Sequence, residues 1–255
     1  MLNQNSVPQS CTSGNVVRFE YAHLCCRNCD MRQVCPSSRP GDGKAAGSGM
    51  LASRTLARGD HLFRQGDPLK TLYVVRSGSV KTYLSTRYGL DHVVRFYLPG
   101  EVIGLDALAD SHHPSSAQAL EISSVCRISL DAVDGNRSNP KIQRQLLKLA
   151  SQEMVSEHAR SVMLAQRDAS ERLATFLLQL SQRYAKRGYS NHEFNLSMSR
   201  QDIASLLALA VETVSRLFTH FQSIGLISVD RRHVRLLSLD GLRELVVTDH
   251  LRTVQ

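Results

Sequence analysis

Four cysteines constrain this chain more than any other feature of its sequence. Cys26, Cys29 and Cys35 form a C-x2-C-x5-C pattern on a short polar segment, and Cys126 follows about ninety residues later. A segment of this size is too small to bury a core, so its thiols are placed for metal binding rather than for packing. Cys126 lies in a predicted strand, residues 122–130, and a folded domain must bring it back to the other three thiols.

The irregular spacing of these thiols bears on which metal they would hold. Four thiolates suit either a tetrahedral zinc ion or an iron–sulfur cluster. Structural zinc sites usually pair two C-x2-C knuckles, whereas this chain has one knuckle, a five-residue gap and a remote fourth cysteine, which favours a cluster. Zinc or a thiol–disulfide switch is the alternative. Cys25 could replace Cys26, although only Cys26 gives the two-residue gap, and Cys126 could be a small buried residue of its strand.

Size, charge and missing motifs narrow the class of protein. The chain has 255 residues, of which 42% are hydrophobic, enough for two modest domains. It shows neither a signal pattern nor an apolar run of about 18 residues, so we expect a cytoplasmic protein with no membrane partner. Cytoplasmic thiols stay reduced, so six cysteines indicate metal or redox chemistry. A net charge of +8 is compatible with nucleic acid but not diagnostic. No nucleotide-binding, zinc-protease or nucleophile-elbow motif appears, and an enzyme is not expected.

The pattern along the chain predicts an α+β protein in four parts. Residues 1–50 form the cysteine-bearing segment and a linker, because residues 36–49 are dense in Gly, Pro and Ser. Residues 51–138 carry short β-segments separated by turn signals, which predicts an antiparallel β-roll of the jelly-roll kind. Residues 139–166 read as one long helix. Residues 167–255 read as helix, turn, helix and β-hairpin, the plan of a winged helix-turn-helix.

The long helix carries a narrow stripe at helical spacing. Pro140 suits its start, and no Gly or Pro interrupts residues 141–165. The stripe predicts a dimer seam, although packing within the chain's own domain explains it equally well. Glu157 would face its own copy in a symmetric dimer, and this cost could make dimerisation conditional. The expected seam residues are Leu147, Ala150, Met154, Glu157 and Ser161, with Leu164 continuing the stripe.

The second helix of the helix-turn-helix is the predicted DNA reader. Ser199 is an N-cap candidate for the first helix, with Asp202 three residues on. The second helix opens Val211-Glu-Thr-Val-Ser-Arg216, where Glu212, Ser215 and Arg216 share one face and can bond to cytosine or guanine edges. Glu212 and Arg216 could instead form an exposed i,i+4 pair, but the following hairpin favours DNA contact. Val211 and Thr213, in the same first turn, complete the expected DNA-binding set.

These motifs together resemble the fumarate–nitrate reduction regulators (FNR) of the CRP/FNR superfamily, from about residue 24 to 245. Besides the thiol pattern and the recognition helix, the matching pieces include Ser77-Gly-Ser-Val-Lys81, Phe96-Tyr-Leu-Pro-Gly100, His112-His-Pro-Ser115, Ala117-Gln-Ala-Leu-Glu121 and Glu171-Arg-Leu173.

The resemblance implies an oxygen-sensing, DNA-binding homodimer. In that family four thiolates hold a [4Fe–4S] cluster, which oxygen converts to [2Fe–2S], and the dimer then falls apart. Carried over, the ligands are Cys26, Cys29, Cys35 and Cys126. The resemblance also implies a TTGAT-N4-ATCAA-like palindrome in double-stranded DNA, and RNA polymerase as a partner.

Two features of the chain differ from the family pattern, and a third bears on cyclic-nucleotide binding in the wider superfamily. The stretch before the roll is rich in Gly, Pro and Ser where the family has an acidic amphipathic helix. Ala208 and Ala210 stand where the family's turn carries Gly and Thr, and Ala210 cannot cap the recognition helix. Cyclic-nucleotide binding in the superfamily needs an arginine that the stretch 114–117 lacks, so no cyclic nucleotide is expected.

Overall fold

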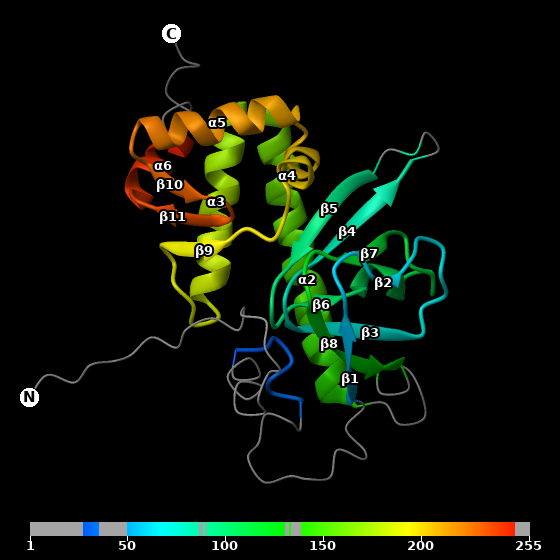
Figure 1. Cartoon of the computed structure of the whole chain (residues 1–255). Coiled ribbons are helices and arrows are strands. Elements are labelled where there is room, and N and C mark those ends of the chain that lie inside the picture. The colour runs from blue at the N-terminus through cyan, green and yellow to red at the C-terminus, as the bar shows by residue number, and fades with distance from the viewer. Residues whose placement is uncertain are drawn as a thin grey trace, which may run out of the picture.

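The computed structural model describes residues 28–35, 50–86, 89, 91–130, 133 and 139–247. Cys25, Cys26, and the linker at 36–49 lie outside these residues. The described chain consists of a β-roll, one long helix and a helical domain with a small sheet, as predicted (Figure 1).

Two four-stranded antiparallel sheets make up the β-roll, in the strand orders β1-β8-β3-β6 and β2-β7-β4-β5. The predicted roll is therefore confirmed, and the strand predicted at 122–130 is β8, which residues 120–122 separate from β7. The Leu120 N–H donates to the Ser79 carbonyl and so fixes this connection. The strands are β1 (Met50–Leu56), β2 (His61–Phe63), β3 (Thr71–Ser77), β4 (Val80–Ser85), β5 (Asp91–Tyr97), β6 (Val102–Ile103), β7 (Ser116–Ala119) and β8 (Ser123–Ser129).

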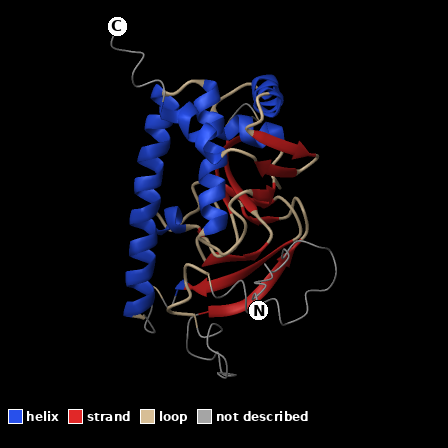
Figure 2. Cartoon of the chain, turned by 90° about the vertical axis from the view of Figure 1, so that its left-hand side faces the viewer, coloured by secondary structure: helices blue, strands red, loops and turns tan. Residues whose placement is uncertain are grey.

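Five helices and three short strands follow the roll. The longest helix runs along one edge of the molecule and joins the roll to the helical domain (Figure 2). The α3, α4 and α5 helices, the β10-β11-β9 sheet and α6 form the helical domain. Their bounds are α2 (Pro140–Gln166), α3 (Ala169–Ala185), β9 (Glu193–Asn195), α4 (Arg200–Leu207), α5 (Val211–Ser223), β10 (Ile227–Asp230), β11 (His233–Leu236) and α6 (Leu239–Val247).

Local side-chain chemistry starts most of these helices. Ser199 and Asp202 form a full capping box on α4, as their spacing predicts. Asp168 and Glu171 form another on α3. Pro140 occupies the first turn of α2 and Asn139 caps it.

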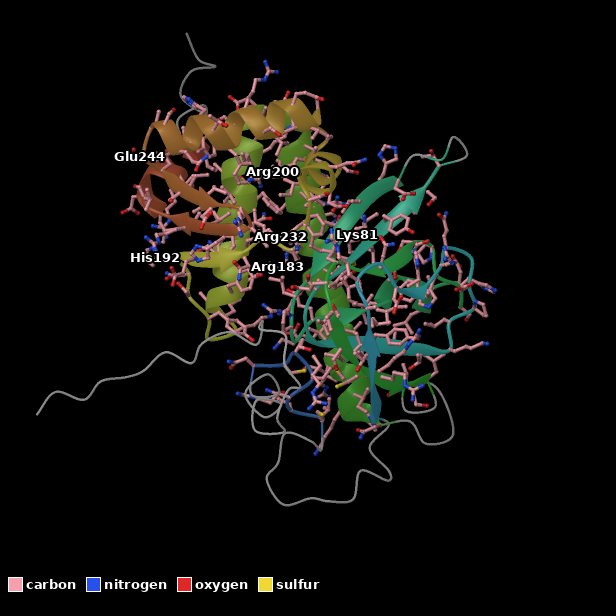
Figure 3. The ribbon with its side chains drawn as sticks, in the orientation of Figure 1. Lys81, Arg183, His192, Arg200, Arg232 and Glu244 are labelled. Carbon is pink, nitrogen blue, oxygen red and sulfur yellow. The ribbon has the colours of Figure 1, made fainter. Side chains whose placement is uncertain are left out.

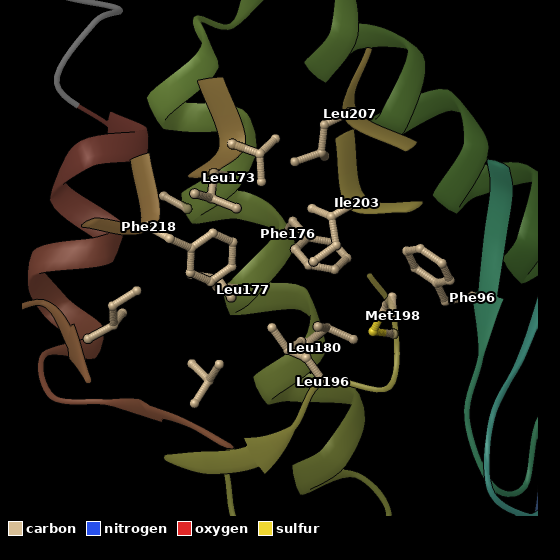
Figure 4. Close-up of a cluster of buried hydrophobic side chains, with 14 of the residues drawn as sticks. Phe96, Leu173, Phe176, Leu177, Leu180, Leu196, Met198, Ile203, Leu207 and Phe218 are labelled. Carbon is tan, nitrogen blue, oxygen red and sulfur yellow. The ribbon is translucent and has the colours of Figure 1, made fainter. Parts of the chain in front are cut away.

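One apolar core joins the helical domain to the roll. Its centre is built by α3, α4 and α5, with Leu177, Ile203 and Phe218 buried together (Figure 4). Phe96 of β5 belongs to the same buried cluster, so the roll packs directly on the helical domain. Lys81 of β4 adds an ion pair with Asp202 of α4 at 2.6 Å, and Figure 3 shows Lys81 on the roll side of this boundary.

Among the described residues, no single helix combines the length and hydropathy needed to cross a bilayer; α4 and α5 reach the threshold only as a pair, and that pair is bent by 104°.

Candidate nucleic-acid interface and thiol site

The recognition helix α5 presents the predicted readers to solvent. Glu212, Ser215 and Arg216 are all exposed on its outer face, whereas Thr213 is half-buried. Val211 is 37% exposed at the first turn. In Figure 1 this helix forms the outermost layer of the helical domain, away from the roll. A rigid helix with exposed polar side chains at its start is the geometry that the major groove of DNA accepts.

The opposite face of α5 fixes the helix in place. Val214, Phe218 and Phe221 are 0–2% exposed and pack in the core shared with α3 and α4. Inward and outward residues alternate at helical spacing, so the exposed side chains that we predict to read DNA need not contribute to stability.

The turn before α5 departs from ideal backbone chemistry. Ala208 ends α4 in the left-handed conformation, with φ 53°, which a residue with a Cβ adopts at a cost. Ala210 occupies the N-cap of α5 and makes no side-chain cap bond, as its side chain predicts.

Arg172 braces this turn from α3. Its guanidinium donates to the carbonyl of Leu207 at 3.2 Å and to that of Leu164, near the end of α2, at 2.9 Å. It also donates to the carbonyl of Arg167 in the connection between α2 and α3. One side chain thus ties the long helix to the DNA-reading turn. The sequence offered only the Glu171-Arg-Leu173 resemblance as a signal for this role.

The thiol segment, which we define as residues 28–35, consists of tight turns, and its most deeply buried side chain is Met31. Met31 is 0% exposed and enters a hydrophobic cluster of the roll and α2. Cys29 and Cys126 both pack against that same cluster, although they come from distant parts of the chain. Cys35 is buried, and its N–H donates to the Met31 carbonyl at 2.9 Å.

Cys126 reaches this place through the sheet. It lies in the middle of β8, opposite Val74 of β3, and is partly buried. The sheet therefore places the remote cysteine on the same hydrophobic cluster as Cys29 of the thiol segment. Cys26 lies outside the described residues. Within the described residues, no three Cys, His, Asp or Glu side chains are grouped closely enough to hold a single metal ion. Sulfur atoms are visible in Figure 3 where the thiol segment meets the roll.

Polar bonds attach the thiol segment to three parts of the molecule. The Asp30 N–H donates to the Gly100 carbonyl of the roll at 2.9 Å. Gln145 of α2 donates to the Asp30 carbonyl at 2.6 Å. Asn28 donates to the Arg187 carbonyl, just past α3, at 2.7 Å. The segment thus touches the roll, the long helix and the helical domain at once.

The approach to Gly100 leaves no room for a side chain. A Cβ there would lie 3.0 Å from the Asn28 carbonyl oxygen and 3.2 Å from the Cys29 Cα, and Gly100 has φ 94°. Both the left-handed backbone and the close contact require glycine. The glycine of Phe96-Tyr-Leu-Pro-Gly100 therefore serves the docking of the thiol segment.

A buried carboxylate lies beneath the same contact. Glu101 is 7% exposed and pairs with Arg183 at 2.6 Å and with Arg187 at 2.9 Å. Burial alone would raise the pKa of Glu101, but the two arginines outweigh it and lower the pKa to about 2. For Asp30, burial outweighs the attraction of Arg187, so its pKa is raised. Figure 3 shows Arg183 at the boundary between the helical domain and the roll.

The predicted seam on α2 is partly open to solvent. Leu147 and Met154 are 69% and 61% exposed, Ser161 is exposed, and Ala150 is half-buried. Glu157 is half-buried and accepts a bond from Arg160 Nε at 2.9 Å, so within one copy its charge is already paired.

The exposed apolar surface of α2 also includes residues that the predicted stripe omitted. Val155 and Val162 are 69% and 54% exposed, and each directly follows a residue of the predicted stripe, Met154 or Ser161. The inner face is built instead by Ile142, Leu146 and Met163, which are buried. The exposed apolar surface is therefore wider than the predicted seam. A count of apolar residues at i, i+7 would have found the pair Val155 and Val162.

Comparisons with known proteins agree with this geometry. The Crp-like helix-turn-helix domain family matches residues 171–245, and the cyclic nucleotide-binding domain family matches residues 53–135. Among solved structures, FixK2 from Bradyrhizobium japonicum has a TM-score of 0.70 and 26% identity, covering 76% of this chain and 96% of FixK2. The fold and the exposed recognition helix define a DNA-binding transcription regulator.

Curated relatives place the chain more narrowly. It is 40% identical to the transcriptional activator protein anr of Pseudomonas aeruginosa, over 83% of this chain and 88% of that protein. It is 37% identical to the fumarate and nitrate reduction regulatory protein of Escherichia coli K12, over 90% and 92%. The anaerobic regulatory protein of Haemophilus influenzae is 37% identical over 93% of each. The chain belongs to the CRP/FNR family, among its anaerobic transcription regulators.

Proposed function

We propose that this chain is an oxygen-responsive transcription regulator whose thiols hold a [4Fe–4S] cluster and whose homodimer binds an FNR-type palindrome without oxygen. The observation that carries the proposal is the convergence of Cys29 and Cys126 on one buried cluster of the roll and the long helix. Asn28, next to Cys29, also donates to the Arg187 carbonyl, so a change at the thiol segment would act on the helical domain as well.

The donor set fits an iron–sulfur cluster. Cys29 and Cys126 are partly buried against an apolar cluster and Cys35 is buried, and thiolates are the ligands that iron–sulfur clusters take. Cys26 would supply the fourth thiolate. A cluster carries its thiolates on different irons, so the sulfurs need not meet at one point. When bound, the cluster would supply a centre that oxygen destroys; the chain's residues supply its position and its shelter from water.

The exposed apolar surface of α2 supports a second copy of the chain as partner. Leu147, Met154, Val155 and Val162 are each more than half exposed on one long helix, and none of the described elements covers them there. Pairing two such helices would remove this surface from water, at roughly 25 cal/mol per Å² of apolar area. Glu157 lies at the edge of that surface, where two copies would bring like charges together.

Two copies would place two recognition helices on one face of DNA. Half-sites of a palindrome lie one helical turn apart, about 34 Å, and dimer symmetry matches that repeat. Arg216 would donate to guanine, Glu212 would accept from cytosine, and Ser215 would bond to either. Thr213 and Val211 are placed beside them at the first turn.

The surroundings of Glu101 argue that the roll does not bind cyclic nucleotide. Its carboxylate already accepts bonds from Arg183, Arg187 and the Leu98 N–H. Residues 114–117 contain no arginine to pair with a phosphate. Instead, Glu101 joins the roll to the helical domain through its ion pairs with Arg183 and Arg187.

Iron and acid-labile sulfide assays of protein purified without air test the cluster directly. We expect about four of each per chain from a [4Fe–4S] centre, and Cys126→Ser should lose both. Cys11→Ser, which changes a thiol outside the proposed ligand set, is the matched control and should keep both. Zinc without sulfide would support the alternative of a zinc site, and a metal-free thiol pair would support a disulfide switch.

DNA binding by variants of α5 tests the reading residues. Arg216→Ala should weaken binding to the palindrome by about 1–3 kcal/mol and relax the preference for guanine at one position. Thr219→Ala, on the exposed face but one turn further from the helix start, is the control. Equal losses for both variants would count against base reading by Arg216.

A further inference from the structure

Two arginines of α3 and its end share one buried carboxylate but differ in what else they touch. Arg183 and Arg187 both pair with Glu101. Arg183 otherwise donates to the Phe96 carbonyl, within the roll. Arg187 is 8% exposed, donates to the Pro99 carbonyl, and lies 3.8 Å from the Asp30 carboxylate of the thiol segment. Only Arg187 therefore contacts both the roll and the thiol segment.

The backbone of Arg187 completes this arrangement. Its carbonyl accepts the bond from Asn28, while Asn28 Nδ2 also lies 3.1 Å from where a Cβ on Gly188 would stand. The guanidinium side thus faces Asp30 and the carbonyl side holds Asn28. One residue grips the thiol segment on both sides of Cys29.

Helix α3 leads from this contact to the DNA reader. Arg187 follows the end of α3 by two residues, and the guanidinium also donates back to the Arg183 carbonyl. Leu173 and Leu177 of the same helix share a buried cluster with Phe218 of α5. A displaced thiol segment would therefore act on α3, which carries the recognition helix, without passing through α2.

We propose that Arg187 is the positioning residue that couples the thiol segment directly to the helical domain, in parallel with the route through the long helix. This deepens the proposed function and rests on it for its biological meaning. The physical contact, however, can be measured without iron. Loss of Arg187 should free the thiol segment, whereas loss of Arg183 should weaken the roll boundary and leave the segment docked.

Amide hydrogen exchange of the full-length, reduced chain tests this coupling. Charge-assisted hydrogen bonds to buried groups are worth enough that losing them raises local opening by roughly tenfold or more. We expect Arg187→Ala to speed exchange of the Asp30 and Cys35 amides by about tenfold. Arg183→Ala, the matched control, should change these two amides less than threefold. Equal acceleration in both variants, or none in either, would overturn the proposal.

A second variant tests the same coupling if Arg187→Ala does not fold. Asn28→Ala removes only the bond to the Arg187 carbonyl and leaves the buried ion pairs intact. It should speed exchange in the thiol segment and also in the amides at the end of α3, including that of Gly188. Acceleration confined to the segment would contradict coupling to the helical domain. Iron content plays no part in this readout, so a failed cluster assay and a failed exchange experiment are distinguishable.

Discussion

The recognition helix and the thiol segment are held by opposite means. On α5, Val214, Phe218 and Phe221 are nearly fully buried in a core that spans most of the helical domain. The thiol segment has one fully buried side chain, Met31, with Cys35 also buried, and single bonds to Gly100, Gln145 and Arg187. The recognition helix therefore has more buried side chains holding it in place than the thiol segment has.

This difference explains how a signal can act without unfolding the protein. Local opening free energies range from near zero to the global value, and segments with few buried contacts lie at the low end. The thiol segment can therefore open at a lower cost than unfolding of the whole chain, while α5 keeps its shape. Regulation then needs only a change in position of an intact reader, or in pairing of intact copies.

The largest effect should follow from damage to the helix core. Phe221→Ala removes a side chain that is 0% exposed and should cost about 3–5 kcal/mol of unfolding free energy. Urea unfolding measures it, with His220→Ala, an exposed neighbour on α5, as control. A loss below about 1 kcal/mol would show that this core does not hold the reader.

Replacing Met31, the most deeply buried side chain of the thiol segment, should have a local effect instead. Met31→Ala should cost about 2–5 kcal/mol of docking free energy, because it empties a fully buried site. The exchange rates of the Val34 and Cys35 amides should rise by more than tenfold. The midpoint of global unfolding in urea should change little. A fall in global stability equal to that of Phe221→Ala would erase the distinction between the two regions.

Acid should weaken the boundary beneath the segment. The pKa of Glu101 falls from 4.5 to about 2 in the folded chain. A lowered folded pKa stabilises the chain above the unfolded value, and this contribution is lost as pH falls from about 4.5 towards 2. The loss amounts to about 3 kcal/mol at most. The free energy of unfolding, measured across this pH range, should fall more steeply with decreasing pH in the wild-type chain than in Glu101→Gln. Identical slopes in the two proteins would contradict the ion pairs.

The smallest effect should be a gain at the turn before α5. Ala210→Thr would supply the missing cap and should stabilise the chain by about 1 kcal/mol. Ala210→Val, which has nearly the same shape without the hydroxyl, is the control and should show no gain. Thermal unfolding of the pair isolates the hydroxyl. Equal midpoints would mean that the helix start is satisfied by other means.

Local patterns allowed most of the helical domain to be predicted. The spacing of Ser199 and Asp202 predicts the start of α4, and Pro140 predicts the start of α2. Apolar residues at helical spacing predict which face of α5 is buried. The same reasoning missed β9 and α6, because three residues give no periodicity and an internal Gly241 obscures a helix. In the roll, the sequence pattern predicts short strands but not their pairing, which joins β1 to β8 and β6 to β3.

The candidate thiol site is a prediction from residue type and spacing, and the residues that support it could not be predicted. Cys29, Cys35 and Cys126 could be grouped from their spacing, and that grouping stays a prediction. Glu101 and Arg187 could not, because they are 86 positions apart and look like ordinary surface charges in sequence. Residues that hold a site together across domains leave no periodic signal; only the fold brings them into contact.

One titration tests the central claim most directly. Protein purified without air is added to a fluorescent DNA carrying the TTGAT-N4-ATCAA palindrome, and anisotropy and sedimentation are recorded before and after the same sample meets oxygen. The account predicts tight binding by a dimer at first, then a shift to monomer with at least tenfold weaker binding after exposure. Binding and mass that stay unchanged in oxygen would contradict it.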